Sequence, residues 1–325
     1  MLEDTYQSDL PQSEPGASLE SVLRDDLAHG DAMLGTIAPI LRHLLANDDH
    51  SVFGDEIIAR MRGMAADIGT QLLDEMAVAS GRTERRPPQG AQHETLVQAL
   101  VEIPDFLTHL HGQALEWQLT ERLHGRLALD TVLSPLLQAL IASPEAATAG
   151  LAMNFLAAQA RFCQNQRRMK LPLGELPGDL LHGALEALVR VTPDEATPLA
   201  EQAVRRIRAR YDESCGRLGL IARLVTGMGA GTVAALSITH GGVAIFLTAL
   251  SLASGQSRDM AVLATNESQV ARFALALRAA GLKPQAIEEQ FLALHPEVAL
   301  PEGFDRLGAD RAAGLLALSG RMVRG

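Results

Sequence analysis

Histidine and cysteine are the residues of this chain best suited to metal or nucleophilic chemistry, and their spacing decides whether such chemistry is expected. The chain has 10 His and 2 Cys among 325 residues. His109 and His111 are two positions apart, which on a helix directs their rings to opposite sides, whereas a helical zinc pair needs i and i+4. Cys163 and Cys215 offer neither metal spacing nor a disulfide framework. The sequence therefore predicts no metal site and no cofactor.

The two cysteines each allow an inert and a chemical interpretation. Cys163 lies in the basic segment RFCQNQRRMK, and neighbouring positive charge lowers the pKa of a thiol. A reactive Cys163 is therefore one hypothesis, although an inert thiol is favoured. Cys215 falls on a stripe of apolar residues with helical spacing, which predicts a buried and inert thiol.

His240 is the only titratable side chain in a run without formal charge from Leu224 to Ser257. One hypothesis is a buried histidine that changes charge near neutral pH. A pocket beside it would indicate a small-molecule-binding protein or an unrecognised enzyme. The favoured interpretation is a histidine that hydrogen-bonds a neighbouring helix end. No GxSxG nucleophile motif occurs, and no catalytic residue is predicted.

Two basic clusters oppose the acidic balance of the chain, whose formal net charge is −11. They consist of Arg161, Arg167, Arg168 and Lys170 in the first and of Arg205, Arg206, Arg208 and Arg210 in the second. Glu201 precedes Arg205 by four positions, so a salt-bridged, solvated helix is one interpretation. The other is a docking face for an acidic peptide, an acidic protein or nucleic acid. The scarcity of aromatic residues and the net charge disfavour nucleic acid and membrane surfaces.

The composition indicates helices. Hydrophobic residues make up 47% of the chain but aromatic residues only 3%, so the core must consist of Leu, Ala, Val, Ile and Met, which favour helices more than strands. We predict an all-α protein. Its expected parts are a disordered tail (1–17), an N-terminal helical module (18–80), a Gly- and Pro-rich linker (81–93) and a helical repeat domain (94–325).

The charge-free run itself has three interpretations. A membrane helix needs about 20 consecutive apolar residues, but six glycines interrupt the run. The GMGAG segment lacks the preceding strand and the following acidic residue of a dinucleotide site. A core helix remains, which loses its polar face because it is buried on most sides.

Two helical segments repeat one pattern. The spacing of Phe246, Ala249, Leu250 and Ala253 recurs in Phe273, Ala276, Leu277 and Ala280. Each set precedes a glycine, Gly255 or Gly281, which predicts a left-handed helix end. This succession of helix, glycine and shorter helix favours stacked helical pairs, as in an α-solenoid; an irregular helical bundle is the alternative.

The residues that carry this pattern also resemble a known family. The segments at 134–185 and 239–282 are similar to a domain of unknown function found mainly in alphaproteobacteria. Its shared features here are His240, Gly241, Phe246, the Ala249–Leu250 pair and the AAGL at 279–282. The family often has an acidic residue after the His-Gly pair, where this chain has Gly242. The resemblance implies a HEAT-like helical repeat fold and no known activity.

These observations favour a noncatalytic scaffold or regulatory adaptor that binds a protein partner along one surface of its helical array. The expected location is the cytoplasm, because the N-terminal residues lack a basic and an apolar signal region. The methionine-rich segment from Ile57 to Met76 adds the hypothesis that the N-terminal module self-associates or grips a partner helix.

Overall fold

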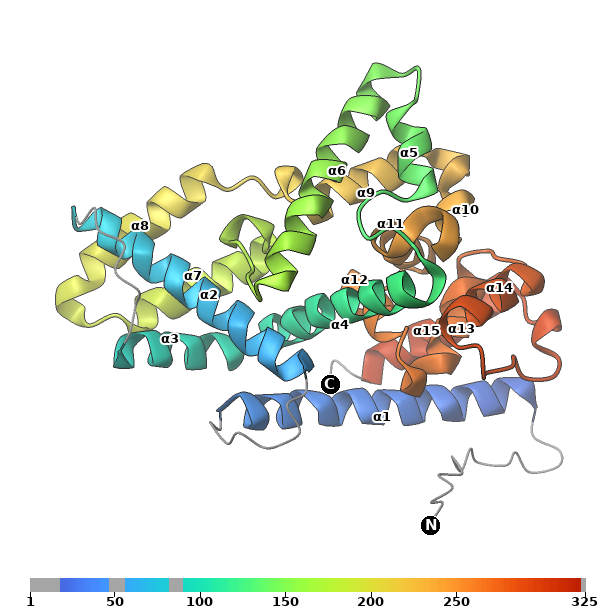
Figure 1. Ribbon diagram of the computed structural model, residues 1–325. Helices are drawn as coiled ribbons and strands as arrows, with labels where there is room; N and C mark the ends of the chain where they lie inside the picture. Colours follow the sequence, from blue (N-terminus) through green and yellow to red (C-terminus); the bar gives the residue numbers. More distant parts are fainter. Residues whose placement is uncertain (1–17, 47–55, 82–89, 323–325) are drawn as a thin grey trace, which may run out of the picture.

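The computed structural model describes residues 18–46, 56–81 and 90–322, and these residues form helices and turns with no strand (Figure 1). The α-helices are α1 (Leu19–Ala46), α2 (Glu56–Ala79), α3 (Ala91–Val101), α4 (Pro104–Leu127), α5 (Pro135–Ile141), α6 (Ala146–Arg167), α7 (Gly178–Val191), α8 (Thr197–Arg210), α9 (Arg217–Gly227), α10 (Thr232–Ala235), α11 (Ile238–Ser254), α12 (Arg258–Leu263), α13 (Val270–Ala279), α14 (Pro284–Leu294) and α15 (Ala309–Met322). The predicted all-α fold is confirmed. The stacking of helix pairs into a solenoid stays a prediction.

The sequence of α4 sets both ends of this long helix. Pro104 takes the first helical position, where a missing N–H costs nothing, and Asp105 places negative charge in the first turn. Arg126 lies in the last turn, and Ala128 ends the helix with a φ of 53°. The 24 residues of α4 span about 36 Å, which lets one helix connect the two ends of the molecule.

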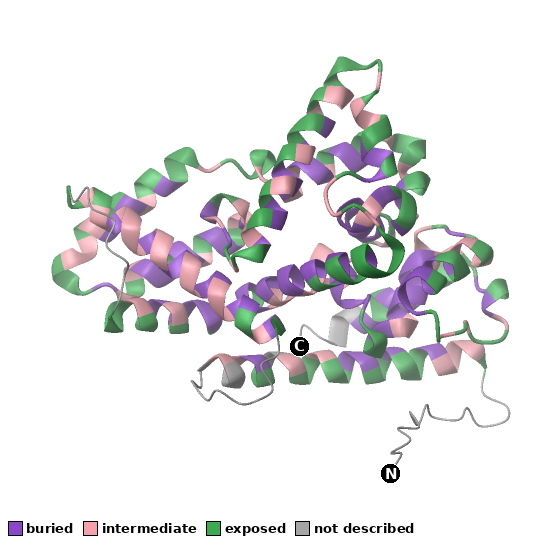
Figure 2. Ribbon diagram, viewed as in Figure 1, coloured by how far each residue is buried: buried purple, intermediate pink, exposed green. Residues whose placement is uncertain are grey.

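Two large hydrophobic cores lie at opposite ends of the molecule, and α4 contributes to both (Figures 1 and 2). α2, α3, α7 and α8 form one core, in which Phe106 and Leu110 of α4 are buried. The other core is formed largely by α9, α11, α13 and α15, and buries Leu119 and Leu123. The middle of α4 therefore lies where the two cores meet.

The two N-terminal helices do not form a module of their own, contrary to the predicted division. α1 and α2 contact each other, but α1 also packs against α4, α13 and α15, and α2 packs more extensively against α3, α4 and α8. Two helices alone would bury too little apolar surface to be stable, and each is completed by later parts of the chain. The predicted linker 81–93 is helical from Ala91 onward, while 82–89 and the predicted tail 1–17 lie outside the described residues.

The methionine-rich face of α2 is covered within the chain. Met61 and Met64 are fully buried in the core shared with α3 and α4. In this fold the face is therefore not available to a second copy of the chain or to a partner helix.

A buried polar contact fastens α1 to the C-terminal helices. The Asp31 carboxylate accepts hydrogen bonds from Arg272 of α13 and, at 2.5 Å, from the Ser319 hydroxyl of α15. Next to it, the Gln269 amide donates to the carbonyl oxygen of Gly30 at 2.7 Å. Because Asp31 and Arg272 are buried as a pair, these bonds fix where α1 lies along α13 and α15.

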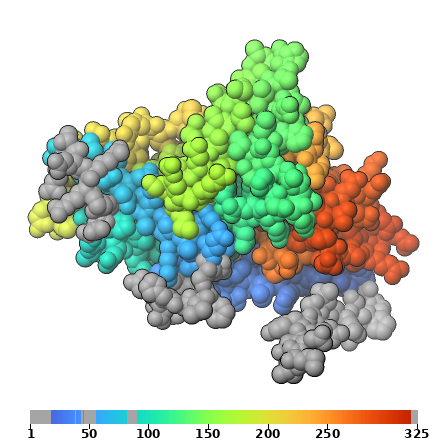
Figure 3. Space-filling model, viewed as in Figure 1, coloured from blue at the N-terminus to red at the C-terminus, as the bar shows by residue number. Residues whose placement is uncertain are grey.

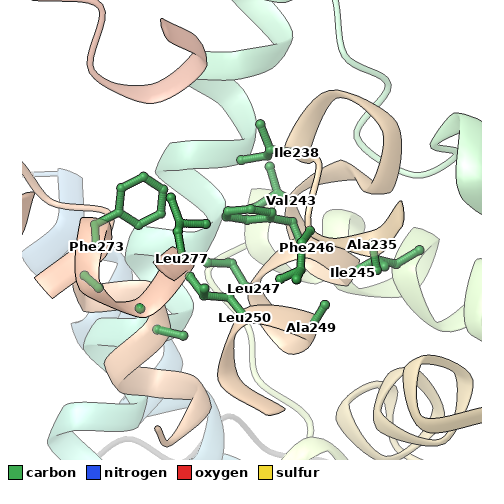
Figure 4. Close-up of a cluster of buried hydrophobic side chains, with 14 of the residues drawn as sticks. Ala235, Ile238, Val243, Ile245, Phe246, Leu247, Ala249, Leu250, Phe273 and Leu277 are labelled. Carbon is green, nitrogen blue, oxygen red and sulfur yellow. The ribbon is translucent and has the colours of Figure 1, made fainter. Parts of the chain in front are cut away.

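The glycine-free part of the charge-free run, from Val243 to Ser254, lies in a core helix, as predicted. In α11 every side chain from Val243 to Ser251 is buried, and Phe246 packs edge-on against Phe273 of α13 at a centroid distance of 6.2 Å (Figure 4). In the described part of the chain no single helix is both long and apolar enough to cross a membrane. One pair, Arg217–Gly227 with Gly229–Ala235, meets those criteria together across a bend of 108°.

The glycines that were predicted to end the two repeated helices adopt the expected conformation. Gly255 follows α11 with a φ of 71°, and Gly281 follows α13 with a φ of 89°. Both values lie in the left-handed region that glycine enters without steric cost, so the predicted helix ends are confirmed.

The His-Gly-Gly segment forms a kink at the start of α11. Gly242 has φ 73° and ψ 165°, which interrupts the helical backbone. A Cβ atom on Gly241 would lie 2.9 Å from the carbonyl oxygen of Ala235. The two glycines therefore allow a sharp turn and a close approach between α10 and α11.

His295 is a buried titratable residue in the C-terminal core. Its ring lies 5.9 Å from that of Phe273 and 6.0 Å from that of Phe291, and its Nε2 has no hydrogen-bond partner among the described residues. Burial lowers the pKa of His295, and Arg122 and Arg126 of α4 lower it further, against the opposing effects of Glu267 and the Thr265 carbonyl.

We expect the stability of the protein to fall as the pH decreases below the usual histidine pKa of 6.5. Below that pH the unfolded chain binds a proton at residue 295 that the folded protein does not bind, until the pH reaches the lowered folded pKa. Urea unfolding across this window should show the loss in the wild type and a smaller loss in H295Q. An identical pH dependence in both proteins would contradict the assignment.

Candidate partner-binding groove

The most strongly interacting charges of the described residues form a buried centre at the middle of α4. Glu116 accepts two hydrogen bonds from Arg217 of α9, at 2.8 and 3.0 Å, and two from Arg258 of α12, both at 2.8 Å. The amide oxygens of Gln113 and Gln159 accept further bonds from Arg217. The centre therefore joins α4 to α9 and α12, which both contribute to the core that contains α11 and α13.

The groups of this centre satisfy one another. Burial alone would raise the pKa of the Glu116 carboxyl, but the charges and hydrogen bonds of Arg217 and Arg258 outweigh it and hold the pKa well below its usual value. Glu116 is thus a permanent anion between two cations. Because its oxygens and the guanidinium groups already have partners, we assign the centre a structural role.

The cysteines and histidines are not gathered into a reactive site. Cys163 is buried and donates to the Thr131 carbonyl at 3.5 Å; burial raises the pKa of its thiol, so the hypothesis of a reactive thiol is wrong. Cys215 is exposed beside Asp212, contrary to prediction, because α8 ends at Arg210 and the apolar stripe does not continue. Among the described residues, no group of three metal-ligating side chains comes together.

The second basic cluster lies on α8, at one edge of the molecule (Figures 1 and 2). α8 buries only Ala200, Ala203 and Ile207. Its four arginines are exposed, and their nearest partners are Glu201 for Arg205, the ring Nδ1 of His182 for Arg208, and Glu75 for both Arg206 and Arg210. The helix is salt-bridged, as one interpretation of the sequence expects, and within the described part of the chain its four guanidinium groups have two carboxylate partners. The docking face stays a prediction.

The first basic cluster lies at the end of α6 and in the segment that follows. Arg161, Arg167 and Arg168 are exposed, and the Arg167 guanidinium lies 5.9 Å from the centre of the Trp117 ring. Lys170 reaches Asp67 of α2 at 3.9 Å. Each cluster thus contacts α2, the first at Asp67 and the second at Glu75.

Polar side chains of α2 hold the segment between α6 and α7 in place. Asp67 accepts a hydrogen bond from the Leu171 N–H at 3.1 Å, and Gln71 accepts from the Leu173 N–H at 3.0 Å while donating to the Leu171 carbonyl at 2.9 Å. Figure 3 shows this yellow-green segment on the surface against the blue of α2. Its backbone thus forms a fixed wall beside α2.

A groove of about 330 Å³ lies between this wall, α2 and α8. Its lining consists of Gln71, Asp74, Glu75, Pro172, Leu173, Gly174, Ile207, Arg210 and Tyr211. Leu173 and Ile207, which are 9% and 5% exposed, form its narrow apolar floor, and Arg210 and Glu75 supply charge. The Tyr211 hydroxyl donates to the Leu176 carbonyl at 2.7 Å, which fixes the ring at one end. The groove combines a rigid apolar surface with exposed guanidinium groups.

His240 does not line the groove. Its side chain is exposed, as is that of Thr239, so the hypothesis of a buried switch is wrong. The neighbouring hollow is lined by Gly241 and Gly242 but not by His240, and its volume of about 20 Å³ has room for about one water molecule.

Several residues of the groove and of the buried centre were not predicted. Asp67, Gln71 and Glu75 follow one another at i, i+4 and i+8, a spacing that places them along one side of α2. Glu116, beside Trp117 and among apolar residues, is a carboxylate on a buried part of its helix. These patterns were visible in the sequence, but neither indicates which distant arginines would meet them.

The chain matches no family model, no curated protein and no solved structure. The resemblance to a helical repeat family therefore stays a prediction.

Proposed function

We propose that this protein is a noncatalytic adaptor that binds an acidic segment of a partner protein along α8 and the groove beside it. The observation that carries the proposal is the charge of α8: among the described residues, its four exposed arginines have only Glu75 and Glu201 as carboxylate partners. On a chain with a net charge of −11, such a local excess of positive charge attracts an acidic partner and orients it.

The sequence that follows α2 carries a further excess of positive charge. Between Gly81 and Gly90, directly after α2, the chain carries Arg82, Arg85 and Arg86 against a single glutamate. A protein partner is favoured over nucleic acid because the one aromatic side chain of the groove, Tyr211, is fastened by its own hydrogen bond and base stacking needs free rings.

We expect the variant R205Q/R206Q/R208Q/R210Q to lose a partner that the wild type retains. The full-length tagged protein is used for affinity capture at low and high salt, and retained proteins are identified by mass spectrometry and then tested as purified pairs. Since the interaction is electrostatic, binding should weaken as the salt concentration rises.

The matched control is R24Q/R126Q/R223Q/R306Q, which removes the same charge from exposed arginines on other helices and turns. It should retain the partner. Equal loss in both variants, or no partner retained by the wild type, would contradict the proposal. Retention that nuclease abolishes would indicate a nucleic acid instead.

A further inference from the structure

Glu75 is placed where a carboxylate of the partner would bind. It lies on the groove wall and contacts Arg210 at 2.6 Å and Arg206 at 3.5 Å. Its side chain is 19% exposed, whereas those of Arg206 and Arg210 are 42% and 58% exposed. The Glu75 carboxylate is thus less exposed than the two arginine side chains that it contacts.

One carboxylate leaves most of the hydrogen-bonding capacity of two arginines unused. Each guanidinium group has five N–H donors, and the contact of Arg206 is long for a hydrogen bond. An incoming carboxylate can therefore bind both arginines from the solvent side, but only if the negative charge of Glu75 is tolerated or moved aside.

We propose that Glu75 is an internal competitor that sets the affinity of the groove for the acidic segment, an inference that rests on the proposed function. An acidic side chain of the partner takes Arg206 and Arg210 from Glu75, and the Glu75 side chain turns toward solvent. Glu75 thus lowers the affinity of Arg206 and Arg210 for any incoming carboxylate, so that single acidic residues on unrelated proteins do not bind.

The apolar part of the groove specifies the residue next to that carboxylate. Leu173 and Ile207 line the groove together with Arg210, so a segment whose carboxylate binds the arginine places a neighbouring side chain on apolar surface. The groove of about 330 Å³ has room for side chains of a short segment but not for a whole helix. The segment that fits therefore pairs an acidic residue with an apolar one.

The test measures binding of a short labelled peptide of alternating Glu and Leu to the full-length protein by fluorescence anisotropy at low salt. E75Q should bind it about three- to tenfold more tightly than the wild type, since two surface guanidinium groups lose their competitor. E75Q/R206Q/R210Q should lose this gain. A peptide of alternating Glu and Ser, with the same charge, should bind more weakly to E75Q.

The matched control is E20Q, which removes a carboxylate partner from Arg311 at the far end of the chain and changes the net charge equally. It should bind as the wild type does. Unchanged or weaker binding by E75Q would overturn the inference, and so would an equal gain in E20Q. If the wild type binds and the four-arginine variant does not while E75Q shows no gain, the adaptor proposal stands without an internal competitor. Binding by E75Q alone would support the competitor and count against a wild-type adaptor.

Discussion

Replacing Glu116 by Gln should lower the free energy of unfolding by about 3–5 kcal/mol. The substitution keeps the size of the side chain but leaves Arg217, which is 2% exposed, and Arg258, which is 13% exposed, without their carboxylate. The loss of stability arises because two cations are then held away from water without an anion beside them. Urea unfolding can be followed through Trp117, the only tryptophan of the chain and the next residue along α4.

Glu121 offers a control on the exposed side of the same helix. E121Q should change stability by no more than about 0.5 kcal/mol. The double variant E116Q/R217Q also removes one of the two unpaired cations. Its loss of stability should therefore be smaller than the sum of the losses of E116Q and R217Q. A loss below about 1 kcal/mol for E116Q would show that water reaches the arginines and that the centre does not hold α4 against α9 and α12.

The pH dependence gives a second readout of the same centre. The pKa of folded Glu116 lies below its usual value of 4.5, so its contribution to stability is complete above that pH and is lost as the pH falls toward the folded pKa. E116Q lacks this group and should lose less stability than the wild type over the same acidic range.

Features that depend on neighbouring residues could be predicted from the sequence. The all-α class follows from composition, and the buried α11 follows from the charge-free run. The left-handed conformations of Gly255 and Gly281 follow from their places after apolar helical segments. In each case the decisive interactions lie within a few positions of one another.

Features that depend on distant residues could not be predicted. Glu75 and Arg206 are 131 positions apart, and Glu116 and Arg258 are 142 apart. The sequence shows that these side chains are charged, but only the arrangement of α2, α4, α8 and α12 decides which charges meet. For the same reason the predicted N-terminal module is incomplete: α1 and α2 contact each other, but the later helices on which each also packs are not encoded in their own periodicity.

Replacing Gly242 by Ala should destabilise the protein by about 2–4 kcal/mol. The backbone at Gly242, with φ 73° and ψ 165°, is in a region that side chains other than glycine hardly enter. A Cβ atom there would also lie 2.9 Å from the Cβ atom of Ser134. The matched control is G150A in α6, where a Cβ atom meets nothing within 4 Å and the substitution should stabilise the helix by about 0.5–1 kcal/mol.

The two sources of strain at Gly242 can be separated with Ser134, whose hydroxyl accepts a hydrogen bond from the Leu137 N–H at the start of α5. In S134G the clashing Cβ atom is absent, so G242A should cost less in an S134G background than in the wild type if the contact dominates. An equal cost in both backgrounds would assign the loss to the backbone conformation. Either result makes the His-Gly-Gly segment a structural kink. A G242A variant as stable as the wild type would instead mean that α11 can start as an uninterrupted helix. The two glycines would then need another explanation.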